Sequence, residues 1–529
     1  MRVQLIHPPA FLNPTALTAL RPSLPLGLAY IAGSARAAGH DVSIIDAVGD
    51  DPNLIVRIGK VAQLGTPVDG IVAAIAPETQ VIGVSAMFTY QWFVVRELIQ
   101  AIKAARPDVL VVGGGEHFTG LPAVSLEQSP VDILVIGEGE EIFVDLLKRY
   151  EAWHADHQHD LSNIGASVCD WAEGLAGTVY RRDDEIVPEE RRARILDVDN
   201  IPAPAWELFD VKGYDENRLI NGVRSGRTMP VLATRGCPYR CRYCSSANAW
   251  TTKWVAREPK QVVDEIEGYV ETYGATNFPF QDLTAILKRD WILDFCNELI
   301  DRDLKITWQL PTGTRCEVID DEVAALLRRS GSMQLNFAPE SGSEEVRKKI
   351  AKQMKEESLF NAVKAAVGQG INVTCFFVLG FPRDNVEAYR DTARWAARLA
   401  KLGVDDAAVG FFFPIPGTSF FKELEDEGRA ELDENLILAP IFVHDRWLTE
   451  NRNYSVTLSA ATLTYWRYRI VWAFYSRAVI FNPKRWLRIV RNFYSGREDS
   501  KFDSFLQILK ERFITKRAAK VSTPPGNSR

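Results

Sequence analysis

The sequence predicts an α/β protein in which two successive series of strands and helices precede a mainly helical C-terminal region. Short apolar runs alternate with amphipathic segments through the first 150 residues, and the same alternation returns between residues 228 and 430. Such alternation is typical of parallel strands joined by helices that cover a sheet. The length of 529 residues is also sufficient for about three domains.

The first series predicts a Rossmann-like domain over residues 1–150. Its strands are expected at residues 2–7, 41–46, 81–86, 109–113 and 132–136, and two of its helices at residues 26–38 and 92–105. Folds of this kind bind ligands beyond the carboxyl ends of their strands. The candidate binding residues at those ends are Pro9, Ser85, Met87, Gly114, Gly115, Glu116, His117, Gly137, Glu138 and Gly139.

The second series predicts an open, partial barrel over residues 228–430, after a linker region at residues 151–227. The linker contains an expected hairpin at residues 177–187. Six strands are expected at residues 230–235, 277–281, 305–309, 334–339, 372–379 and 407–413. Helices are expected at residues 260–273, 289–302, 320–329, 359–368 and 386–402. Six units are too few to close an eight-unit barrel, and the chemistry of such barrels lies at the carboxyl ends of the strands.

The C-terminal region, residues 431–520, is expected to be helical, and residues 521–529 are expected to be a disordered tail because they are small, polar and proline-rich. Within residues 463–494, Trp and Tyr alternate with Arg and Lys. One interpretation is a helical bundle that covers the barrel mouth with a solvated basic face. A second is a pair of interfacial helices in peripheral contact with a membrane, and a third is stacking on nucleic-acid bases.

The composition indicates the class of protein and the cellular compartment. The chain is 46% hydrophobic and 25% charged, as expected of a globular protein, and its formal net charge of −7 argues against nucleic acid as a partner. We find no apolar stretch of about 18 residues that could cross a bilayer and no secretory signal. Three of the seven cysteines fall within eight residues. This clustering favours a reduced, cytoplasmic protein over a disulfide framework.

The clustered cysteines, Cys237, Cys241 and Cys244, have the spacing C-x3-C-x2-C. Three closely spaced thiolates can hold three irons of a cubane iron–sulfur cluster and leave the fourth iron open to a ligand. The neighbouring Arg235, Arg240 and Arg242 are expected to favour the thiolate form. The alternative is a zinc site, but zinc is normally bound by four ligands with C-x2-C pairs, and no fourth cysteine or nearby histidine follows.

This motif, with an aromatic residue before the third cysteine, resembles the signature of the radical S-adenosylmethionine (SAM) superfamily. The turns after the later strands agree with the resemblance in order, including the Pro416-Gly417-Thr418 turn that resembles one branch. The resemblance implies a 4Fe–4S cluster on the three cysteines. It also implies SAM contacts from Tyr243, Gln281, Asp282, Glu340, Ser341 and Gly380, although the doubled acid usual near Gln281 and Asp282 is absent.

The branch in question resembles the cobalamin-binding radical SAM enzymes, in which an α/β domain precedes the barrel. Arg21-Pro22 and the segment 24–28 before the first helix fit that branch. The resemblance therefore implies that the strand-end residues of the first domain bind cobalamin. The motif D-x-H-x-x-G, which supplies a histidine to cobalt in other cobalamin enzymes, is absent. The alternative is a Rossmann-like module that binds nothing.

The resemblance further implies that a 5′-deoxyadenosyl radical abstracts hydrogen from an unactivated carbon. The leading hypothesis is C-methylation of an apolar, lipid-like or otherwise large molecule, with flavodoxin or ferredoxin as electron donor. The alternatives are oxidative ring formation, as in the anaerobic magnesium-protoporphyrin ester cyclase, methylthiolation of RNA, and a non-enzymatic cobalamin-binding scaffold. Trp308, Thr312 and Phe412, at or near the strand ends of the barrel, are candidate substrate contacts.

Overall fold

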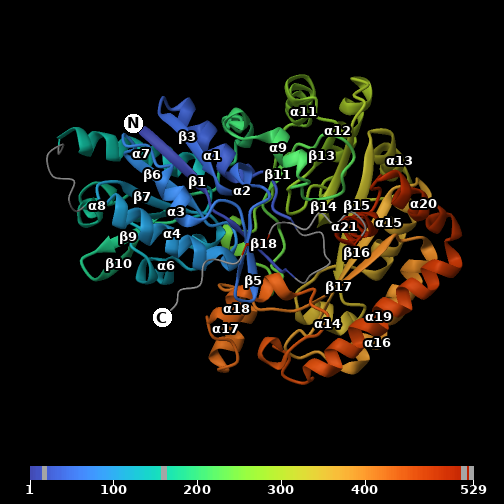
Figure 1. Cartoon of the computed structure of the whole chain (residues 1–529). Helices are drawn as coiled ribbons and strands as arrows, with labels where there is room; N and C mark the ends of the chain where they lie inside the picture. The colour runs from blue at the N-terminus through green and yellow to red at the C-terminus, as the bar shows by residue number, and fades with distance from the viewer. Residues whose placement is uncertain (15–20, 157–163, 514–520, 523–529) are drawn as a thin grey trace.

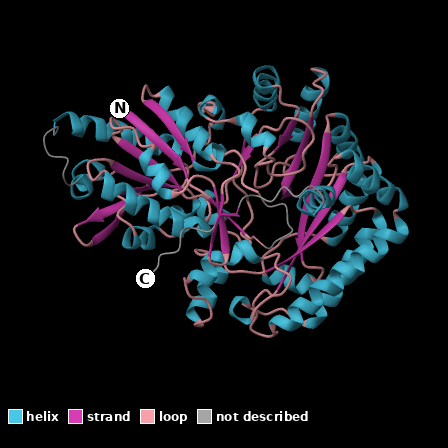
Figure 2. Ribbon diagram, in the orientation of Figure 1, coloured by secondary structure: helices cyan, strands magenta, loops and turns pink. Residues whose placement is uncertain are grey.

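The computed structural model describes residues 1–14, 21–156, 164–513 and 521–522. Two large sheets, each flanked by helices, form the left and right halves of the molecule in Figure 1, and Figure 2 shows the helices on the outside of both sheets. One cluster of buried apolar side chains includes the barrel core together with Leu26, Tyr30 and Leu64 of the N-terminal half. The two halves are therefore packed against each other through a continuous core.

The N-terminal sheet has seven strands in the order β10-β9-β8-β7-β6-β1-β3. Five of them run parallel: β1 (Arg2–His7), β3 (Asp41–Asp46), β6 (Val81–Ser85), β7 (Leu110–Gly114) and β8 (Ile133–Val135). The helices α1 (Leu26–Ala37), α4 (Trp92–Ala105) and α7 (Gly139–Asp156) connect them. The predicted α/β arrangement of this half is confirmed, and each predicted strand lies within one residue of the observed one at both ends.

The hairpin expected in the linker lies at the edge of this same sheet. Its strands β9 (Thr178–Arg182) and β10 (Glu185–Pro188) extend the sheet antiparallel beyond β8, after the helix α8 (Ile164–Ala172). Part of the predicted linker therefore belongs structurally to the N-terminal half. The local pattern could not show this, because the strand joins its partner only after a long excursion of the chain.

A small sheet that the sequence analysis did not expect lies between the two halves. It consists of β2 (Ala10–Leu12), β5 (Val61–Leu64), β4 (Ile55–Ile58) and β18 (Val521–Ser522). The first two residues of the segment expected to be a disordered tail thus pair as a strand with β4. The rest of that segment, residues 523–529, lies outside the described residues.

The barrel sheet contains five parallel strands in chain order, β13 (Asn277–Pro279), β14 (Thr307–Thr314), β15 (Ser332–Glu340), β16 (Asn372–Leu379) and β17 (Asp406–Phe411). The helices α11 (Pro259–Tyr273), α12 (Arg289–Asp301), α13 (Asp321–Arg329), α15 (Glu356–Gly368) and α16 (Val386–Leu402) cover its outer face. This is the predicted open, partial barrel.

The predicted first barrel strand, residues 230–235, is irregular. Only two isolated parallel bridges, Thr228 to Asn277 and Val231 to Phe280, join this stretch to β13. Its last two residues form β11 (Thr234–Arg235), which pairs antiparallel with β12 (Val255–Ala256). Pro230 has no backbone N–H to donate to a ladder, which is one reason why such a strand stays at a sheet edge.

The C-terminal region is helical, as predicted. The helix α19 (Ala460–Phe481) packs along α16, and α20 (Pro483–Ser495) follows it at the outer edge of the barrel half (Figure 1). The helix α21 (Lys501–Phe513) packs against α20. Within the described residues, no helix is both long enough and apolar enough to span a membrane.

Candidate active site

The three clustered cysteines lie on the loop between β11 and α10 (Ser246–Trp250), and all three are half-buried. Burial raises the pKa of Cys237 and of Cys241, and the nearby Cys244 raises both further. Three thiolates can bind three irons of a cubane cluster, whereas zinc is normally bound by four ligands. The three thiols on this loop are therefore the donor set expected of a cluster.

The cations near these thiols are not the ones that the sequence analysis expected. Arg235 is buried in ion pairs with Glu138 and Glu140, and Arg242 pairs with Glu423. Both arginines are thus engaged by carboxylates distant in sequence, and neither is among the main charges that lower the pKa of Cys237 or Cys241.

Lys352 and Arg315 supply the positive charge instead. Lys352 lowers the pKa of both Cys237 and Cys241, and Arg315 lowers that of Cys237. Neither residue was proposed from sequence, because both reach the loop from later barrel units. Each acts against burial, which is the largest influence on both thiols.

A polar triad stands beside the cysteine loop at the end of β15. The Tyr243 hydroxyl donates to Glu340 Oε1 at 2.7 Å, and Lys352 Nζ donates to the same oxygen at 3.1 Å. Glu340 has a φ of 63°, in the left-handed region that residues other than glycine rarely adopt. This backbone geometry turns the carboxylate out of the strand and toward the cysteine loop. Tyr243 and Glu340, two of the expected SAM contacts, thus lie together, and their contact with SAM stays a prediction.

The residues after β13 divide into two roles. Gln281 Nε2 is buried without a hydrogen-bond partner in the described structure, while its Oε1 accepts from Asn221 Nδ2 at 2.9 Å. An unpaired buried amide is costly unless a bound group satisfies it. Gln281 therefore fits a ligand contact.

Asp282 instead binds the backbone of the irregular first strand of the barrel. Its carboxylate accepts from the backbone N–H of Ala233 and of Thr234 and from the Thr234 hydroxyl. Burial raises its pKa to about 6. Its oxygens are engaged within the protein, so the geometry favours a positioning role over the expected SAM contact.

Ser341 and Gly380 are held by two helices. The Ser341 carbonyl accepts from Arg347 of α14 (Glu344–Lys349), and its hydroxyl lies 3.4 Å from Thr392 Oγ1 of α16. The Gly380 N–H donates to the Tyr389 hydroxyl of α16 at 3.0 Å. Both residues lie at barrel strand ends, as expected, but these polar groups are engaged by α14 and α16, so any contact with SAM would come from the remaining surface of these turns.

The carboxyl edge of the N-terminal sheet is nearly free of side chains. A Cβ added at Gly114 would meet nothing within 4 Å, and one at Gly137 would meet only the Ala249 carbonyl at 3.9 Å. Gly115 has a φ of 116°, and a side chain there would collide with Ala86. Glycines let a bulky ligand approach the backbone closely. This bare edge fits the tail of a cobalamin.

The other candidates from the end of β6 and from β1 flank this edge. Ser85 is half-buried, and Met87 is 46% exposed. Pro9 is buried, and its carbonyl accepts from Gln91 Nε2 at 3.4 Å. Met87 thus provides an apolar surface beside the glycines, and Pro9 helps to support the loop from below.

His117 does not reach the edge. Its ring stacks on Trp92 with 4.5 Å between centroids, and it is 1% exposed. Burial lowers its pKa to about 3, so the ring is neutral at ordinary pH. The expected contact with cobalamin is not supported for this residue, whose ring belongs to the core between α4 and α5 (Glu116–Gly120).

Glu116 and Glu138 join the two halves, whereas Gly139 is packed within the first half. The Ser245 hydroxyl donates to Glu116, and Glu138 accepts from Arg194 Nε at 2.5 Å and from Arg235 at 3.3 Å. A Cβ on Gly139 would meet Ile31 at 2.9 Å. Glu138 is thus fully used in a buried ion-pair network, which the sequence could not show because its partners come from other segments.

The two strand-end edges converge through these contacts. Ser245 directly follows the third cysteine, and Asn248 of α10 donates to the carbonyl of Gly417 in the Pro-Gly-Thr turn. Gly417 in turn lies beside Gly120, at the end of α5. The glycine-rich loops of the first half, the cysteine loop and the turn after β17 therefore surround one shared region.

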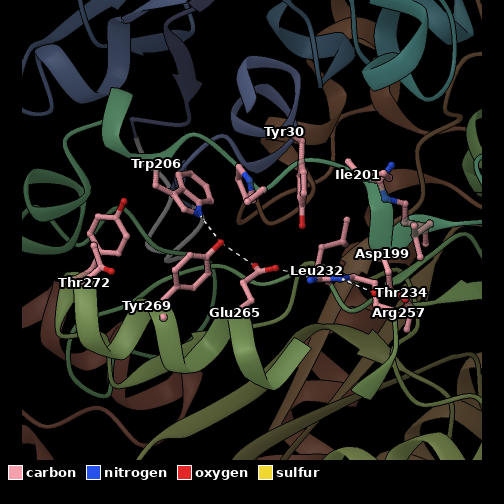
Figure 3. A pocket seen from close by; sticks show the side chains of 16 residues that line it. Tyr30, Asp199, Ile201, Trp206, Leu232, Thr234, Arg257, Glu265, Tyr269 and Thr272 are labelled. Carbon is pink, nitrogen blue, oxygen red and sulfur yellow. Dashed lines mark hydrogen bonds and ion pairs between the residues drawn. The ribbon is translucent and has the colours of Figure 1, made fainter. Parts of the chain in front are cut away.

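A cavity of about 500 Å³ lies behind this region, at the seam of the two halves. Figure 3 shows a polar chain across it: Trp206 Nε1 donates to the Tyr269 hydroxyl, which donates to Glu265, and Glu265 also pairs with Arg257. None of the three cysteines lines this cavity. The cavity is thus separate from the cysteine loop, although Arg235 of the buried ion-pair network is among its lining residues.

Two of the three candidate substrate contacts are core residues. Trp308 is fully buried, packs on Phe280 and donates to the Ser330 carbonyl. Phe412 is buried between Phe381 and Phe420. Side chains alternate between the two faces of a strand, and Trp308 faces the helices rather than the barrel interior. Thr312 is exposed in part, but its hydroxyl donates to the Asp282 carbonyl.

Comparison with known protein families assigns both halves. A B12 binding domain matches residues 14–147, and the Radical SAM superfamily matches residues 231–396. The chain therefore belongs to the cobalamin-binding radical SAM enzymes, and its cofactors are a 4Fe–4S cluster, SAM and cobalamin.

Individual relatives fall within this class. The chain is 28% identical over 399 residues to an uncharacterized methyltransferase, PH0819, of Pyrococcus horikoshii, covering 75% of this chain and 78% of the relative. It is 28% identical over 435 residues to the anaerobic magnesium-protoporphyrin IX monomethyl ester cyclase of Cereibacter sphaeroides, covering 81% of this chain and 64% of the cyclase.

A solved structure shares the fold. It is the radical SAM methyltransferase TsrM of Kitasatospora setae with its tryptophan substrate and a SAM analogue bound. The TM-score is 0.59 at 18% identity, with 80% of this chain and 76% of that chain covered. The relatives are thus methyltransferases and a cyclase, which act on different substrates.

Proposed function

We propose that this chain is a C-methyltransferase that acts on an unactivated carbon of an apolar, lipid-like or otherwise large molecule. The observation that carries the proposal is the hydrogen bond from Ser245 to Glu116, which joins the cysteine loop to the glycine-rich edge of the first sheet. A substrate held between these two edges would face both cofactors at once. Reaction requires the reacting atoms to lie within about 3–3.5 Å.

The balance of the proposed reaction is simple. A C–H bond of the substrate breaks and a C–CH3 bond forms. One SAM is cleaved to methionine and to 5′-deoxyadenosine, which carries the hydrogen away. The methyl group comes from a second SAM, which becomes S-adenosylhomocysteine, and an external donor such as flavodoxin or ferredoxin supplies two electrons. When bound, the cluster with SAM supplies the radical, and cobalamin carries the methyl group.

The residues of the chain bind and position the reactants. The thiolates of Cys237, Cys241 and Cys244 would hold the cluster. Gln281 and the Tyr243–Glu340–Lys352 triad would orient SAM, while Gly114, Gly115 and Gly137 would admit cobalamin. The buried pairs of Arg235 with Glu138 and Glu140 hold the two edges at a fixed separation.

A second candidate function is oxidative ring formation on a tetrapyrrole or another natural product. It is favoured by the similarity to anaerobic magnesium-protoporphyrin IX monomethyl ester cyclases from three organisms. The two functions differ in their products. Methylation consumes a second SAM and leaves S-adenosylhomocysteine, whereas ring formation adds no carbon to the substrate.

The deciding experiment uses anaerobically purified protein loaded with cobalamin, SAM carrying a trideuterated methyl group, and a fractionated extract of apolar metabolites. A product heavier by the labelled methyl group, formed together with S-adenosylhomocysteine and 5′-deoxyadenosine, supports methylation. A cyclised product without label supports the second function. Cys241→Ala serves as the inactive control, and formation of the labelled product by that variant would contradict the proposal.

We place the enzyme in the cytoplasm, where a reduced donor and free thiols are available. Its proposed partners are the electron donor and the substrate, without nucleic acid, because the chain carries a net charge of −7. A peripheral contact with a membrane belongs to the same proposal, since a lipid-like substrate resides there.

A further inference from the structure

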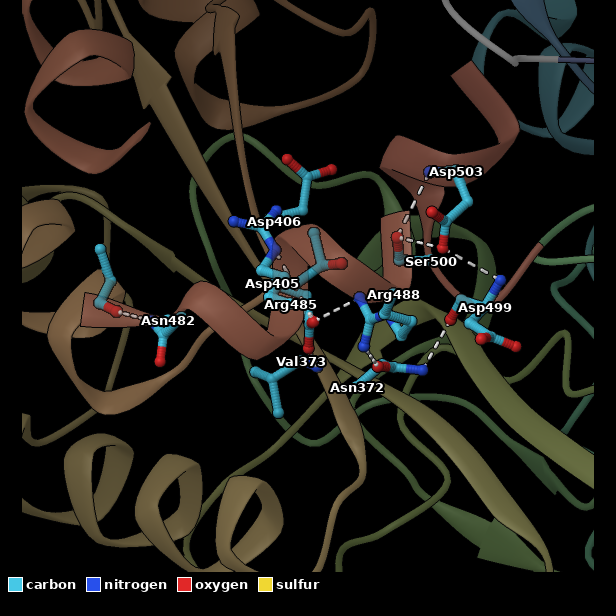
Figure 4. A network of polar contacts seen from close by, with 12 residues as sticks. Asn372, Val373, Asp405, Asp406, Asn482, Arg485, Arg488, Asp499, Ser500 and Asp503 are labelled. Atoms are coloured by element: carbon cyan, nitrogen blue, oxygen red, sulfur yellow. Dashed lines mark hydrogen bonds and ion pairs between the residues drawn. The ribbon is translucent and has the colours of Figure 1, made fainter. Parts of the chain in front are cut away.

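The helix α20 exposes several large apolar side chains to solvent, although Ile489 is buried, and directs Arg485 and Arg488 toward the protein. Arg485 is buried and Arg488 mostly so, whereas Leu487 is 73% exposed and Tyr494 is 78% exposed. Figure 4 shows why: Arg488 donates to Asn372 and to Asp405, each at 2.7 Å, at the start of β16 and just before β17. A surface helix normally buries its apolar stripe. The exposed apolar face of α20 therefore indicates contact with another apolar surface.

The preceding helix, α19, has a matching stripe. Tyr465, Tyr468, Trp472 and Ile480 recur at helical spacing and are all exposed, with Trp472 at 71%. A shallow groove of about 650 Å³, lined in part by Trp447, Tyr465 and Trp472, lies at the start of the stripe. Of the 16 large apolar side chains exposed in the described part of the chain, nine lie in residues 465–494. Such concentration marks an interaction surface rather than scattered exposure.

The charge along this part of the sequence has one sign, although the exposed Glu450 lines the groove at its N-terminal end. Residues 451–497 contain nine basic residues and no Asp or Glu, in a chain whose net charge is −7. Arg469 and Arg491 lie at the exposed stripes and form no ion pair with any residue that the structure describes. Protein segments that lie in the headgroup region of a bilayer typically combine Trp, Tyr and Arg with aliphatic side chains.

We propose that α19 and α20 together form a docking surface for an anionic lipid bilayer. The surface consists of Tyr465, Trp472, Ile480, Leu487, Val490 and Tyr494, with Arg469 and Arg491 paired to lipid phosphates. The helices lie in the interface and do not cross it, in accord with the absence of a spanning helix in the described residues. This inference deepens the proposed function, because it gives an apolar substrate a source, and it rests on that function only for the substrate.

The docking surface is connected to the rim of the barrel. Leu463, in the first turn of α19, lies 3.0 Å from the position of a Cβ on Gly380, and the Val456 N–H donates to the Pro382 carbonyl at 2.7 Å. Gly380 and Pro382 belong to the turn after β16, at the carboxyl edge that carries the chemistry. Docking through α19 therefore brings this rim close to the membrane surface.

The experiment is co-sedimentation of the full-length protein, purified anaerobically with its cofactors, with vesicles of phosphatidylcholine containing about one-third phosphatidylglycerol. We expect binding to these vesicles, weaker binding to pure phosphatidylcholine, and loss of binding at high salt. The variant Trp472→Glu/Ile480→Glu/Leu487→Glu is expected to lower the partition coefficient by about ten-fold or more. Its iron content, visible spectrum and thermal midpoint should match those of the parent, which shows that it is folded.

Matched controls distinguish binding through this surface from non-specific adsorption of the protein to vesicles. Leu196→Glu/Ile58→Glu changes two exposed aliphatic residues elsewhere and is expected to leave binding unchanged. Arg469→Glu/Arg491→Glu should weaken binding to anionic vesicles, whereas Arg57→Glu/Lys60→Glu, which removes as much charge from another surface, should not.

Three results would overturn the proposal: failure of the parent protein to bind anionic vesicles, equal binding by the triple variant, or a soluble dimer that protects α19 and α20. Vesicle binding needs no turnover. A protein that binds vesicles but transfers no methyl group would therefore refute the proposed function alone, and methyl transfer to a dispersed substrate without vesicle binding would refute only the docking surface.

Discussion

The carboxyl edges of the two sheets face the same region but are built in opposite ways. The edge of the N-terminal sheet is bare, with open space above Gly114 and Gly137. The edge of the barrel sheet carries paired polar groups, with Tyr243 and Lys352 both donating to Glu340. The first edge can recognise a large ligand only by shape and backbone contacts. The second can recognise a small charged ligand by ion pairs and hydrogen bonds.

This difference explains how one protein can bind two cofactors, each at its own edge. A bulky ligand needs side chains removed from its path, whereas a zwitterionic ligand needs charges placed against it. The buried network of Arg235, Glu138 and Glu140 lies between the edges and belongs to neither. Its geometry fixes the distance between them.

The largest expected effect comes from the cysteine loop. Cys241→Ser should remove the cluster and reduce activity by about three orders of magnitude or more, because no side chain can replace the radical chemistry. Iron analysis should show the loss, while cobalamin binding should persist if the edges are independent. Cys169→Ser, in the N-terminal half, is the control and should keep full iron content. Loss of cobalamin together with iron would show that the two edges do not bind their cofactors independently.

The next largest effect concerns the seam. Arg235→Gln leaves Glu140 buried without its ion-pair partner and removes one of the two arginine partners of Glu138, and it should cost about 3–5 kcal/mol in the free energy of unfolding. Urea unfolding followed by fluorescence measures it. The exposed pair of Arg36 with Glu207 offers a control, since Arg36→Gln should cost no more than about 1 kcal/mol. Equal costs for the two variants would show that the network does not join the halves.

The bare edge can be tested by filling it. Gly114→Leu should weaken cobalamin binding by about ten-fold or more, equal to about 1.4 kcal/mol. It should change the stability of the cobalamin-free protein by no more than about 0.5 kcal/mol, since a side chain there meets nothing. Gly368→Leu, at another open position on α15, should leave binding intact. Equilibrium dialysis measures the affinity, and unchanged cobalamin binding in Gly114→Leu would assign the cofactor to another place.

The smallest expected effect is a pH dependence at the polar edge. Burial raises the pKa of Asp384, just after the Gly380 turn, to about 7. Because the folded pKa lies above the unfolded one, this carboxyl contributes stability that is full below about pH 4 and is lost as the pH rises through about 7. Asp384→Asn should therefore raise the thermal midpoint relative to the parent more at pH 8 than at pH 5.5. A pH-independent difference would show that Asp384 is ionised throughout.

Much of the fold could be predicted from the pattern of apolar residues. The parallel strands of both halves appear where the alternation of the sequence places them, because burial on both faces imposes a continuous apolar run. The two-residue strand β11 and the β18 pairing were not predictable. Their partners lie far along the chain, and no local period marks such contacts.

The candidate site divides in the same way. The sequence by itself determined the three cysteines and the glycines at Gly114, Gly115 and Gly137, because spacing and the absence of a side chain are properties of the chain itself. Only the tertiary structure decided which charges meet them. It moved Arg235 and Glu138 into a buried pair, placed His117 in the core and brought Lys352 to the thiols, since electrostatic partners are chosen by distance in space and by burial.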